Sequence, residues 1–253
     1  NAGYIMTWGS NVPLTRTPDA HFLTEVRYKG TKVVSVSPDY AESTTSSDAW
    51  LNVKAGTDAA LAMAMGHVIL KEYYIDKETP YFKEYAKEFT DMPFLVRVED
   101  INGAVQPGRF LNAKDLGSKE DGADFQTVLI DETTNEIVVP NGTMGDRHTN
   151  PQKWNLRLEN RNTGAKIDPR LSVFDQREDV TVVKLPYFGD EEHEGVIERA
   201  IPTITVQTVD GPVKVTTVYD LILANYGIDR GIGGEVATSY TDDTPYTPTW
   251  QEK

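Results

Sequence analysis

The chain has 253 residues, enough to bury one large core or a core with a smaller satellite domain. It contains no cysteine, which excludes disulfides, a thiolate nucleophile, thiolate zinc sites and iron–sulfur ligation within this sequence. The formal net charge of -14 argues against nucleic acid or an anionic lipid surface as a partner, and no apolar run approaches the roughly 20 residues of a membrane span, so we expect no nucleic-acid partner and no direct membrane insertion.

The first predicted element is a short apolar strand over Tyr4–Trp8. No secretory leader precedes it, and Asn1 and Ala2 resemble the remnant of a cleaved tag. A chain that runs directly into a strand is unusual for a natural start and typical of a segment cut from a longer protein. We therefore expect an excised fragment.

The residues that follow predict a strand, helix and second strand. A polar loop over residues 9–17 leads to a helix that starts at Pro18 and stops at Gly30. The β-branched residues 31–37 form the second strand, which a right-handed crossover places parallel to the first. This order predicts the beginning of a parallel sheet.

A third strand and two helices continue the α/β pattern. Residues 49–53 predict the strand, and Thr57 is suited to cap a long Ala- and Met-rich helix over residues 58–74. A shorter helix is expected over residues 80–89.

Near Met92 the sequence changes to short β-branched runs separated by turn residues, which predict hairpins. Their turns are expected at residues 102–103, 133–135 and 210–211. A last helix over residues 219–226 ends at Gly227, and the tail after it is expected to be irregular.

The predicted fold class is α/β, with a Rossmann-like parallel sheet, helices on its faces and a β-rich insertion that contains hairpins. We expect a Rossmann-like cofactor-binding segment over residues 3–91 and the β-rich insertion over residues 92–215. Residues 216–253 would return to the α/β domain as a helix and an irregular tail.

Three segments are candidate binding sites because each follows a strand of the predicted sheet. The loop Gly9, Ser10 and Asn11 can offer backbone N–H groups to a phosphate, although an ordinary polar loop explains it equally well. It lacks the G-x-G-x-x-G pattern, which disfavours NAD or FAD bound in the usual manner.

The other two segments offer carboxylates. Asp39, after Pro38 at the end of the second strand, can accept hydrogen bonds from ribose hydroxyls, but a turn residue is the simpler explanation for it alone. At Gly56, Thr57 and Asp58, a carboxylate can accept from the N1–H and the exocyclic amine of guanine, while helix capping explains the same residues. All three segments are expected at one edge of one sheet.

The remaining polar residues do not predict a catalytic or a metal site. We expect His21 and Glu25 to form a local pair on a helix, and His67 to be a hydrogen-bonded core or interface residue rather than a ligand. His148 stands in a polar loop without a nearby histidine, and the acidic residues 190–194 lack the spacing of a calcium loop. No residue is assigned to catalysis.

The sequence resembles the alpha, or catalytic, subunit of membrane-bound respiratory nitrate reductases. The resemblance is carried by YIMTWGSNVPLTRTPDAHF at residues 4–22, EVRYKGTK at 25–32, VSPDYAE at 36–42, GTDAA at 56–60, MAMGHV at 63–68, TTVYDL at 216–221, LANYG at 223–227 and YTP at 246–248. The β-rich middle matches only loosely.

The resemblance implies a molybdenum oxidoreductase of the dimethyl-sulfoxide-reductase class, which reduces nitrate to nitrite at a molybdenum held by two molybdopterin guanine dinucleotides. By similarity, the loop from Trp8 to Asn11 approaches the phosphates of one dinucleotide, Asp39 accepts from its guanosine side, and Asp58 binds the guanine edge.

The family's iron–sulfur motif, for a [4Fe-4S] cluster, and its aspartate ligand to molybdenum are not matched in this chain. We therefore expect the isolated fragment to be inactive and to bind the cofactor weakly or not at all on its own. The parent enzyme is expected at the cytoplasmic face of the cell membrane, with an iron–sulfur beta subunit and a cytochrome b gamma subunit that deliver electrons from quinol, as in anaerobic respiration.

Two other interpretations stay open from the sequence. A related molybdenum enzyme would reduce selenate or chlorate, or would act as a nitrite oxidoreductase, because the residues that select the substrate surround the metal. A stand-alone nucleotide-binding module would need no redox chemistry.

Overall fold

The computed structural model describes residues 2–142, 157–187 and 195–252. The chain divides into two compact units, Asn1–Ala62 and Met63–Lys253. Both α-helices and β-strands are present, and the strands form one parallel and several antiparallel sheets, so the predicted mixed α/β class is confirmed. The two units are described separately below.

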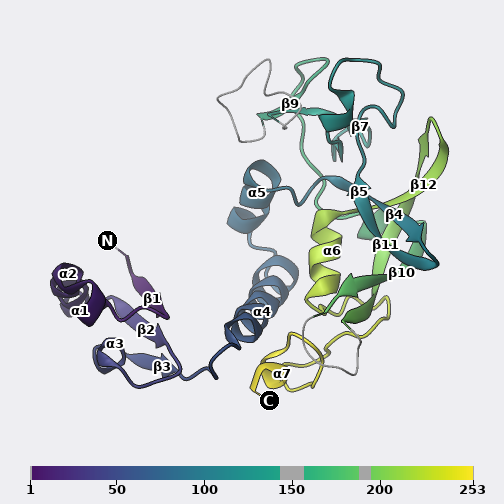
Figure 1. The fold of residues 1–253 in the computed structure, drawn as a ribbon. Coiled ribbons are helices and arrows are strands. Elements are labelled where there is room, and N and C mark those ends of the chain that lie inside the picture. The colour runs from purple at the N-terminus through teal and green to yellow at the C-terminus, as the bar shows by residue number, and fades with distance from the viewer. Residues whose placement is uncertain (1, 143–156, 188–194, 253) are drawn as a thin grey trace. The chain divides into compact units, whose positions relative to one another are not determined.

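The first unit is built on a three-stranded parallel sheet in the order β1-β2-β3 (Figure 1). Its elements are β1 (Tyr4–Trp8), α1 (Val12–Thr15), α2 (Thr17–Tyr28), β2 (Lys32–Val36), α3 (Glu42–Thr45) and β3 (Ala49–Leu51). Trp8 pairs with Val36, which pairs with Leu51, so the three strands end together at one edge. The predicted parallel strands are confirmed.

The central strand β2 carries the core of this unit. Four of its five residues are buried, because β1 and β3 pair with it on both sides and α3 packs against it. Helix α2 begins with a proline in its first turn, as predicted, and Gly30 follows it with a φ of 91°.

Two segments for which no helix was predicted contain single helical turns. In α1 the carbonyl of Asn11 accepts the amides of Leu14 and Thr15, and in α3 the carbonyl of Ala41 accepts the amide of Thr44. Turn residues such as Asn, Ser and Thr satisfy their hydrogen bonds locally, so a short helical turn and a loop have similar sequences.

The division between the units falls within α4 (Asp58–Ile69). The helix predicted over residues 58–74 is α-helical to Ile69 and continues as a π-helix, η1 (Leu70–Asp76), in which the amide of Lys77 reaches the carbonyl of Glu72. Helix α5 (Pro80–Phe89) follows where it was predicted.

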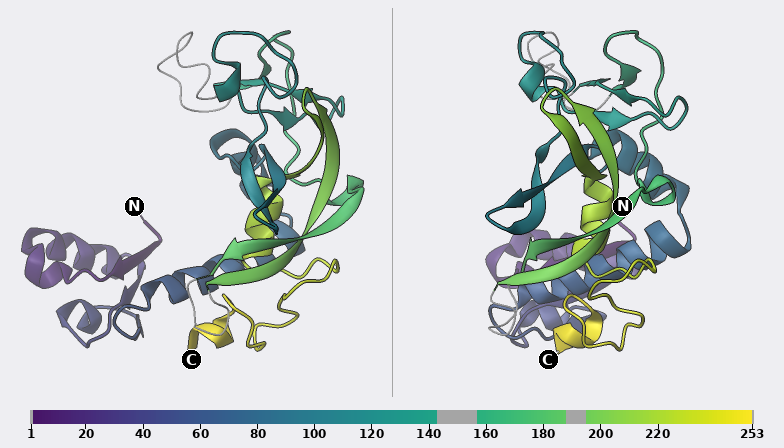
Figure 2. Two further views of the ribbon diagram at one scale, coloured as in Figure 1. Left: turned by 45° about the vertical axis from the view of Figure 1, so that its right-hand side comes forward. Right: turned by 90° about the vertical axis from the view of Figure 1, so that its right-hand side faces the viewer.

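The second unit contains a five-stranded antiparallel sheet in the order β10-β11-β12-β4-β5, whose strands curve along their length (Figure 2). Its strands are β4 (Leu95–Ile101), β5 (Ala104–Phe110), β10 (Asp179–Pro186), β11 (Val196–Thr208) and β12 (Gly211–Thr217). Two small sheets pair β6 (Leu129–Ile130) with β7 (Ile137–Val138) and β8 (Pro140–Asn141) with β9 (Arg157–Asn160).

The three predicted hairpins are present as β4–β5, β6–β7 and β11–β12. Asn102 and Gly103 both have positive φ, 58° and 83°, which is the backbone that a two-residue hairpin turn needs. Helix α6 (Val218–Asn225) confirms the helix predicted over residues 219–226. The tail was expected to be irregular, but it contains α7 (Pro248–Glu252).

Arg109, in strand β5 of the β4–β5 hairpin, donates hydrogen bonds to the buried carboxylate of Asp115. Asp115 is 4% exposed and accepts two hydrogen bonds from Arg109, at 2.7 and 2.5 Å, and one from the amide of Asn112 at 3.1 Å. Burial raises the pKa of Asp115, but the hydrogen bonds from Arg109 and Asn112 outweigh burial and hold the pKa below its ordinary value.

We therefore expect Asp115 to stabilise the fold above its unfolded pKa of about 4 and to lose that contribution as the pH falls through its lower folded pKa. Urea unfolding at pH 7 and at pH 3 should show a smaller acid-induced loss of stability for Asp115→Asn than for the wild type. The exposed Asp121→Asn is the control and should behave as the wild type does. An equal acid-induced loss in all three proteins would contradict the assignment.

Candidate functional site

The candidate site lies at the edge of the first unit where its three parallel strands end. Trp8, Val36 and Leu51 are the last residues of β1, β2 and β3, and they are in register. The predicted segments 9–11 and 38–39 follow directly, and 56–58 follow β3 after a short turn (Figure 1). Ligands of open α/β sheets bind at the carboxyl ends of the strands, so this edge is the part of the unit suited to a nucleotide.

A hydrogen bond joins the first segment to the third. The indole Nε1 of Trp8 donates to Oδ1 of Asp58 at 2.7 Å. Asp58 is exposed, is the first residue of α4, and so lies at the positive end of a helix dipole. The bond orients the carboxylate while it remains open to solvent.

The loop after β1 presents two amides. Gly9 has a φ of 59°, and its own N–H donates to the carbonyl of Val36 at 2.9 Å, so this N–H is not available to a ligand as the sequence had suggested. The amides of Ser10 and Asn11 have no acceptor within the described residues. An added Cβ on Gly9 would meet nothing within 4 Å, so the space above the loop is open.

Asn11 carries an unsatisfied buried atom. Its Nδ2 donates to Oε2 of Glu42 at 2.6 Å, and this hydrogen bond lowers the pKa of Glu42 below its ordinary value. Its Oδ1 is buried and has no partner within the described residues. A buried acceptor without a donor is costly, so a donor from a bound group would be favourable here.

Pro38 and Asp39 are exposed after β2. The Oγ of Ser37 donates to the main-chain carbonyl of Asp39 at 2.8 Å, while the carboxylate of Asp39 makes no hydrogen bond or ion pair with the described residues. Asp39 thus shares the sheet edge with Trp8 and Asp58, but no contact joins it to them.

Gly56 and Thr57 form the turn before α4. Gly56 has a φ of 87°, and the hydroxyl of Thr57 donates to the carbonyl of Lys54 at 2.8 Å. The main-chain carbonyl of Thr57 accepts the amide of Ala60, as at the start of a helix. These residues place Asp58 rather than offering a side chain of their own.

Three residues at this edge were not singled out from the sequence. Glu42 binds Asn11, and Trp50 donates its Nε1 to the carbonyl of Ser37 at 2.9 Å. The ring of Trp50 also packs edge-on against exposed Tyr40, with 5.3 Å between the ring centroids. Tyr40 and Glu42 lie within the matched residues 36–42, which was the only signal for them.

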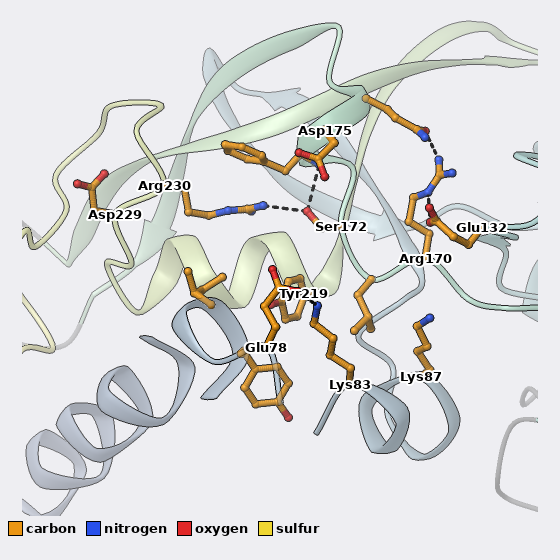
Figure 3. Close-up of a pocket in the computed structure, with 15 residues that line it drawn as sticks. Glu78, Lys83, Lys87, Glu132, Arg170, Ser172, Asp175, Tyr219, Asp229 and Arg230 are labelled. Atoms are coloured by element: carbon orange, nitrogen blue, oxygen red, sulfur yellow. Dashed lines mark hydrogen bonds and ion pairs between the residues drawn. The ribbon is translucent and has the colours of Figure 1, made fainter. Parts of the chain in front are cut away.

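The second unit holds a separate cavity of about 510 Å³ (Figure 3). Its four cations are each paired with a carboxylate, as Lys83 with Glu78, Lys87 with Asp168, Arg170 with Glu132 and Arg230 with Asp220. Because the charges are already matched, this cavity does not favour an anionic nucleotide. Within the described ranges, no group of three or more potential ligands could hold a metal ion.

The predictions for His67 and for the pair of His21 and Glu25 are confirmed. His67 is 2% exposed, its Nδ1 lies 2.6 Å from the carbonyl of Tyr226, and burial lowers its pKa. His21 and Glu25 form a local pair at 3.8 Å. His148 and the acidic residues 190–194 lie outside the described residues.

In the described parts of the chain, none of the helices combines the length and the apolar character that crossing a bilayer requires.

A three-stranded parallel sheet with helices between its strands and polar loops at its carboxyl edge makes this an α/β unit. The family model for molybdopterin oxidoreductases matches residues 1–220, and the chain belongs to that family.

Similar proteins include the nitrate reductase alpha chain of Bacillus subtilis, 53% identical over 253 residues, and the respiratory nitrate reductase 1 alpha chain of Escherichia coli, 47% identical over 266 residues. Both matches cover 100% of this chain but only 20% and 21% of the relatives. The perchlorate reductase subunit alpha of Dechloromonas aromatica is 40% identical over 150 residues, which cover 58% of this chain and 14% of that protein. The chain thus spans about a fifth of the length of the nitrate reductase alpha chains, and the expected resemblance is confirmed.

Proposed function

We propose that this chain is the part of a respiratory nitrate reductase alpha subunit that helps to bind one molybdopterin guanine dinucleotide. The observation that carries the proposal is the exposed carboxylate of Asp58, which Trp8 orients at the carboxyl edge of the parallel sheet. A carboxylate has two acceptor oxygens, which match the N1–H and the exocyclic amine of guanine.

The other residues of this edge fit the rest of the dinucleotide. The amides of Ser10 and Asn11 can donate to phosphate oxygens, and Gly9 leaves room for a close approach. The open carboxylate of Asp39 can accept from ribose hydroxyls.

The remaining residues that we assign to the site shape it. Trp8, Pro38, Gly56 and Thr57 set the course of the loops, and the buried Oδ1 of Asn11 is suited to accept a hydrogen bond from the ligand. When bound, the cofactor supplies the two-electron redox chemistry, and this chain contributes binding and orientation.

The whole protein would reduce nitrate to nitrite with electrons from quinol that arrive through iron–sulfur clusters. We infer the substrate from relatives that match all of this chain, since those from Bacillus subtilis and Escherichia coli are named as nitrate reductase alpha chains. We place the second dinucleotide and the [4Fe-4S] cluster outside this segment. We also propose that the whole protein acts with a beta and a gamma subunit at the cytoplasmic face of the membrane.

A second substrate class is favoured by one relative. The perchlorate reductase subunit alpha matches 58% of this chain, so a chlorine oxyanion is the alternative substrate. Selenate, and nitrite as a reductant, stay open as alternatives from the sequence. Assays of the full-length enzyme with nitrate, chlorate, selenate and nitrite would distinguish them.

Amide NMR of this chain with GDP tests the binding site directly. We expect GDP at millimolar concentration to shift the amides of Ser10, Asn11, Thr57 and Asp58, because its phosphates would contact the first two and its guanine would contact Asp58. ADP should shift the first two and leave the last two unchanged, since adenine lacks the N1–H donor. Unshifted amides with both nucleotides would contradict a preformed site.

A further inference from the structure

Helix α5 and the preceding π-helix carry a continuous aromatic surface. We define the aromatic strip as Tyr73, Tyr81, Tyr85 and Phe89, which are 38%, 69%, 48% and 46% exposed. Ring centroids are 6.3 Å apart between Tyr81 and Tyr85 and 5.1 Å apart between Tyr85 and Phe89, and Phe82 links Tyr81 to Tyr73 at 5.7 and 5.5 Å. Contiguous exposed aromatic side chains are typical of a surface that another segment covers.

The second unit covers only one side of α5. Phe82 and Ala86 pack into a core cluster with Tyr74 and Tyr219. Lys83 and Lys87 are on another side, where they line the cavity of Figure 3 and pair with carboxylates. Helical spacing places residues 81, 85 and 89 beside the buried side rather than within it. The apolar arc of α5 is therefore only partly covered.

Two acidic side chains border the strip. Glu84 and Glu88 are four residues apart on α5, a spacing at which like charges repel. Neither has an ion-pair partner among residues 2–142, 157–187 and 195–252. A cation from outside these residues would remove the repulsion.

We propose that the aromatic strip and its acidic border dock an arginine- or lysine-bearing apolar segment of the same polypeptide, from the part that lies outside these 253 residues. The inference rests on the proposed origin of the chain in a longer alpha subunit. Arginine fits this surface best, because its planar guanidinium pairs with a carboxylate and stacks on an aromatic ring.

The length of the relatives favours a segment of the same polypeptide over a separate subunit. This chain covers 20% and 21% of the two nitrate reductase alpha chains, so most of each relative is available to cover it. A covalently linked segment also binds at a high effective concentration, so a modest contact area is sufficient.

Photo-cross-linking of the full-length alpha subunit tests the inference. With p-benzoylphenylalanine in place of Tyr85, we expect an intramolecular product that maps by mass spectrometry to an arginine- or lysine-bearing peptide outside the 253 residues. The probe retains an aromatic ring, so the fold should tolerate it. A control probe in place of Val209, which is 64% exposed in the β11–β12 turn, should yield no such peptide.

Three results would overturn the proposal: no product from the Tyr85 probe, a product within the 253 residues, or a product with the mass of two chains. Molybdenum content is measured on the same sample. Any of these three results in a sample that contains molybdenum would overturn the docking proposal alone, and a sample without molybdenum would count against the cofactor proposal.

The acidic border has its own test in the same protein. Glu84→Lys combined with Glu88→Lys should lower the yield of the cross-link by about fivefold or more, since two attractive pairs become repulsive. Reversing the charge of the cross-linked basic residue should restore the yield. An unchanged yield in the double variant would contradict the charge complementarity between Glu84, Glu88 and the docked segment, on which the choice of a basic segment depends.

Discussion

Asp58→Ala is expected to weaken retention of the guanine dinucleotide by roughly 100-fold in the full-length enzyme, because two charge-assisted hydrogen bonds to the guanine edge are lost. The substitution also leaves the indole N–H of Trp8 without its acceptor at 2.7 Å. The measurement is the guanine nucleotide that acid releases per alpha subunit, together with the molybdenum content by mass spectrometry.

Two variants separate binding from folding in this experiment. Trp8→Phe keeps the carboxylate and an aromatic ring but removes the indole donor, so a loss of no more than about tenfold is expected. Asp19→Ala, on α2 of the same unit and paired with Arg16 at 2.9 Å, should retain the full nucleotide content. Full retention in Asp58→Ala would refute the guanine-binding role, and equal loss in Asp19→Ala would indicate general destabilisation.

The location of this site was predictable because it depends on strand order. Tyr4–Trp8, the helix that ends before Gly30 and the β-branched second strand predict parallel strands, and parallel strands end at one edge. Gly9, Asp39 and Asp58 follow those ends in the sequence, so their common edge required no knowledge of side-chain contacts.

The side-chain pairs at this edge were not predictable in the same way. Trp8 and Asp58 are 50 residues apart, and Asn11 and Glu42 are 31 apart. Hydrogen bonds over such separations depend on the backbone path of the intervening turns, and local sequence pattern does not report it. The hydrogen bond from the Gly9 amide to the carbonyl of Val36 was not predictable for the same reason.

The β-rich region shows the same limit on a larger scale. Asn102 with Gly103 and Asp210 with Gly211 predict turns, so the hairpins β4–β5 and β11–β12 could be placed from sequence. The pairing of β12 with β4, which merges the two hairpins into one sheet, joins segments more than a hundred residues apart and has no local signal. The assignment of residues 92–215 as an insertion stays a prediction.

The largest effect on stability is expected at Asp220, at the start of α6. Asp220 is 1% exposed, and its carboxylate accepts four hydrogen bonds. The donors are Arg230 at 2.5 Å, the hydroxyl of Ser172 at 2.6 Å, the amide of Val173 at 2.9 Å and the hydroxyl of Thr217 at 2.9 Å. One side chain therefore joins α6, the segment before η4 (Phe174–Gln176) and the chain after α6.

Asp220→Ala should lower the free energy of unfolding of this unit by about 3–5 kcal/mol, because it leaves the guanidinium of Arg230 buried without its carboxylate. That is a large fraction of the roughly 5–15 kcal/mol that holds a domain folded, so urea unfolding followed by circular dichroism should detect it readily.

Asp179→Ala is the control, since Asp179 and Lys214 form a pair at 2.5 Å whose side chains are 55% and 44% exposed. Such an exposed pair is expected to contribute no more than about 1 kcal/mol. Arg230→Met in the Asp220→Ala background should recover part of the loss by removing the uncompensated charge, and additive losses in the double variant would show that the two side chains do not act as a pair.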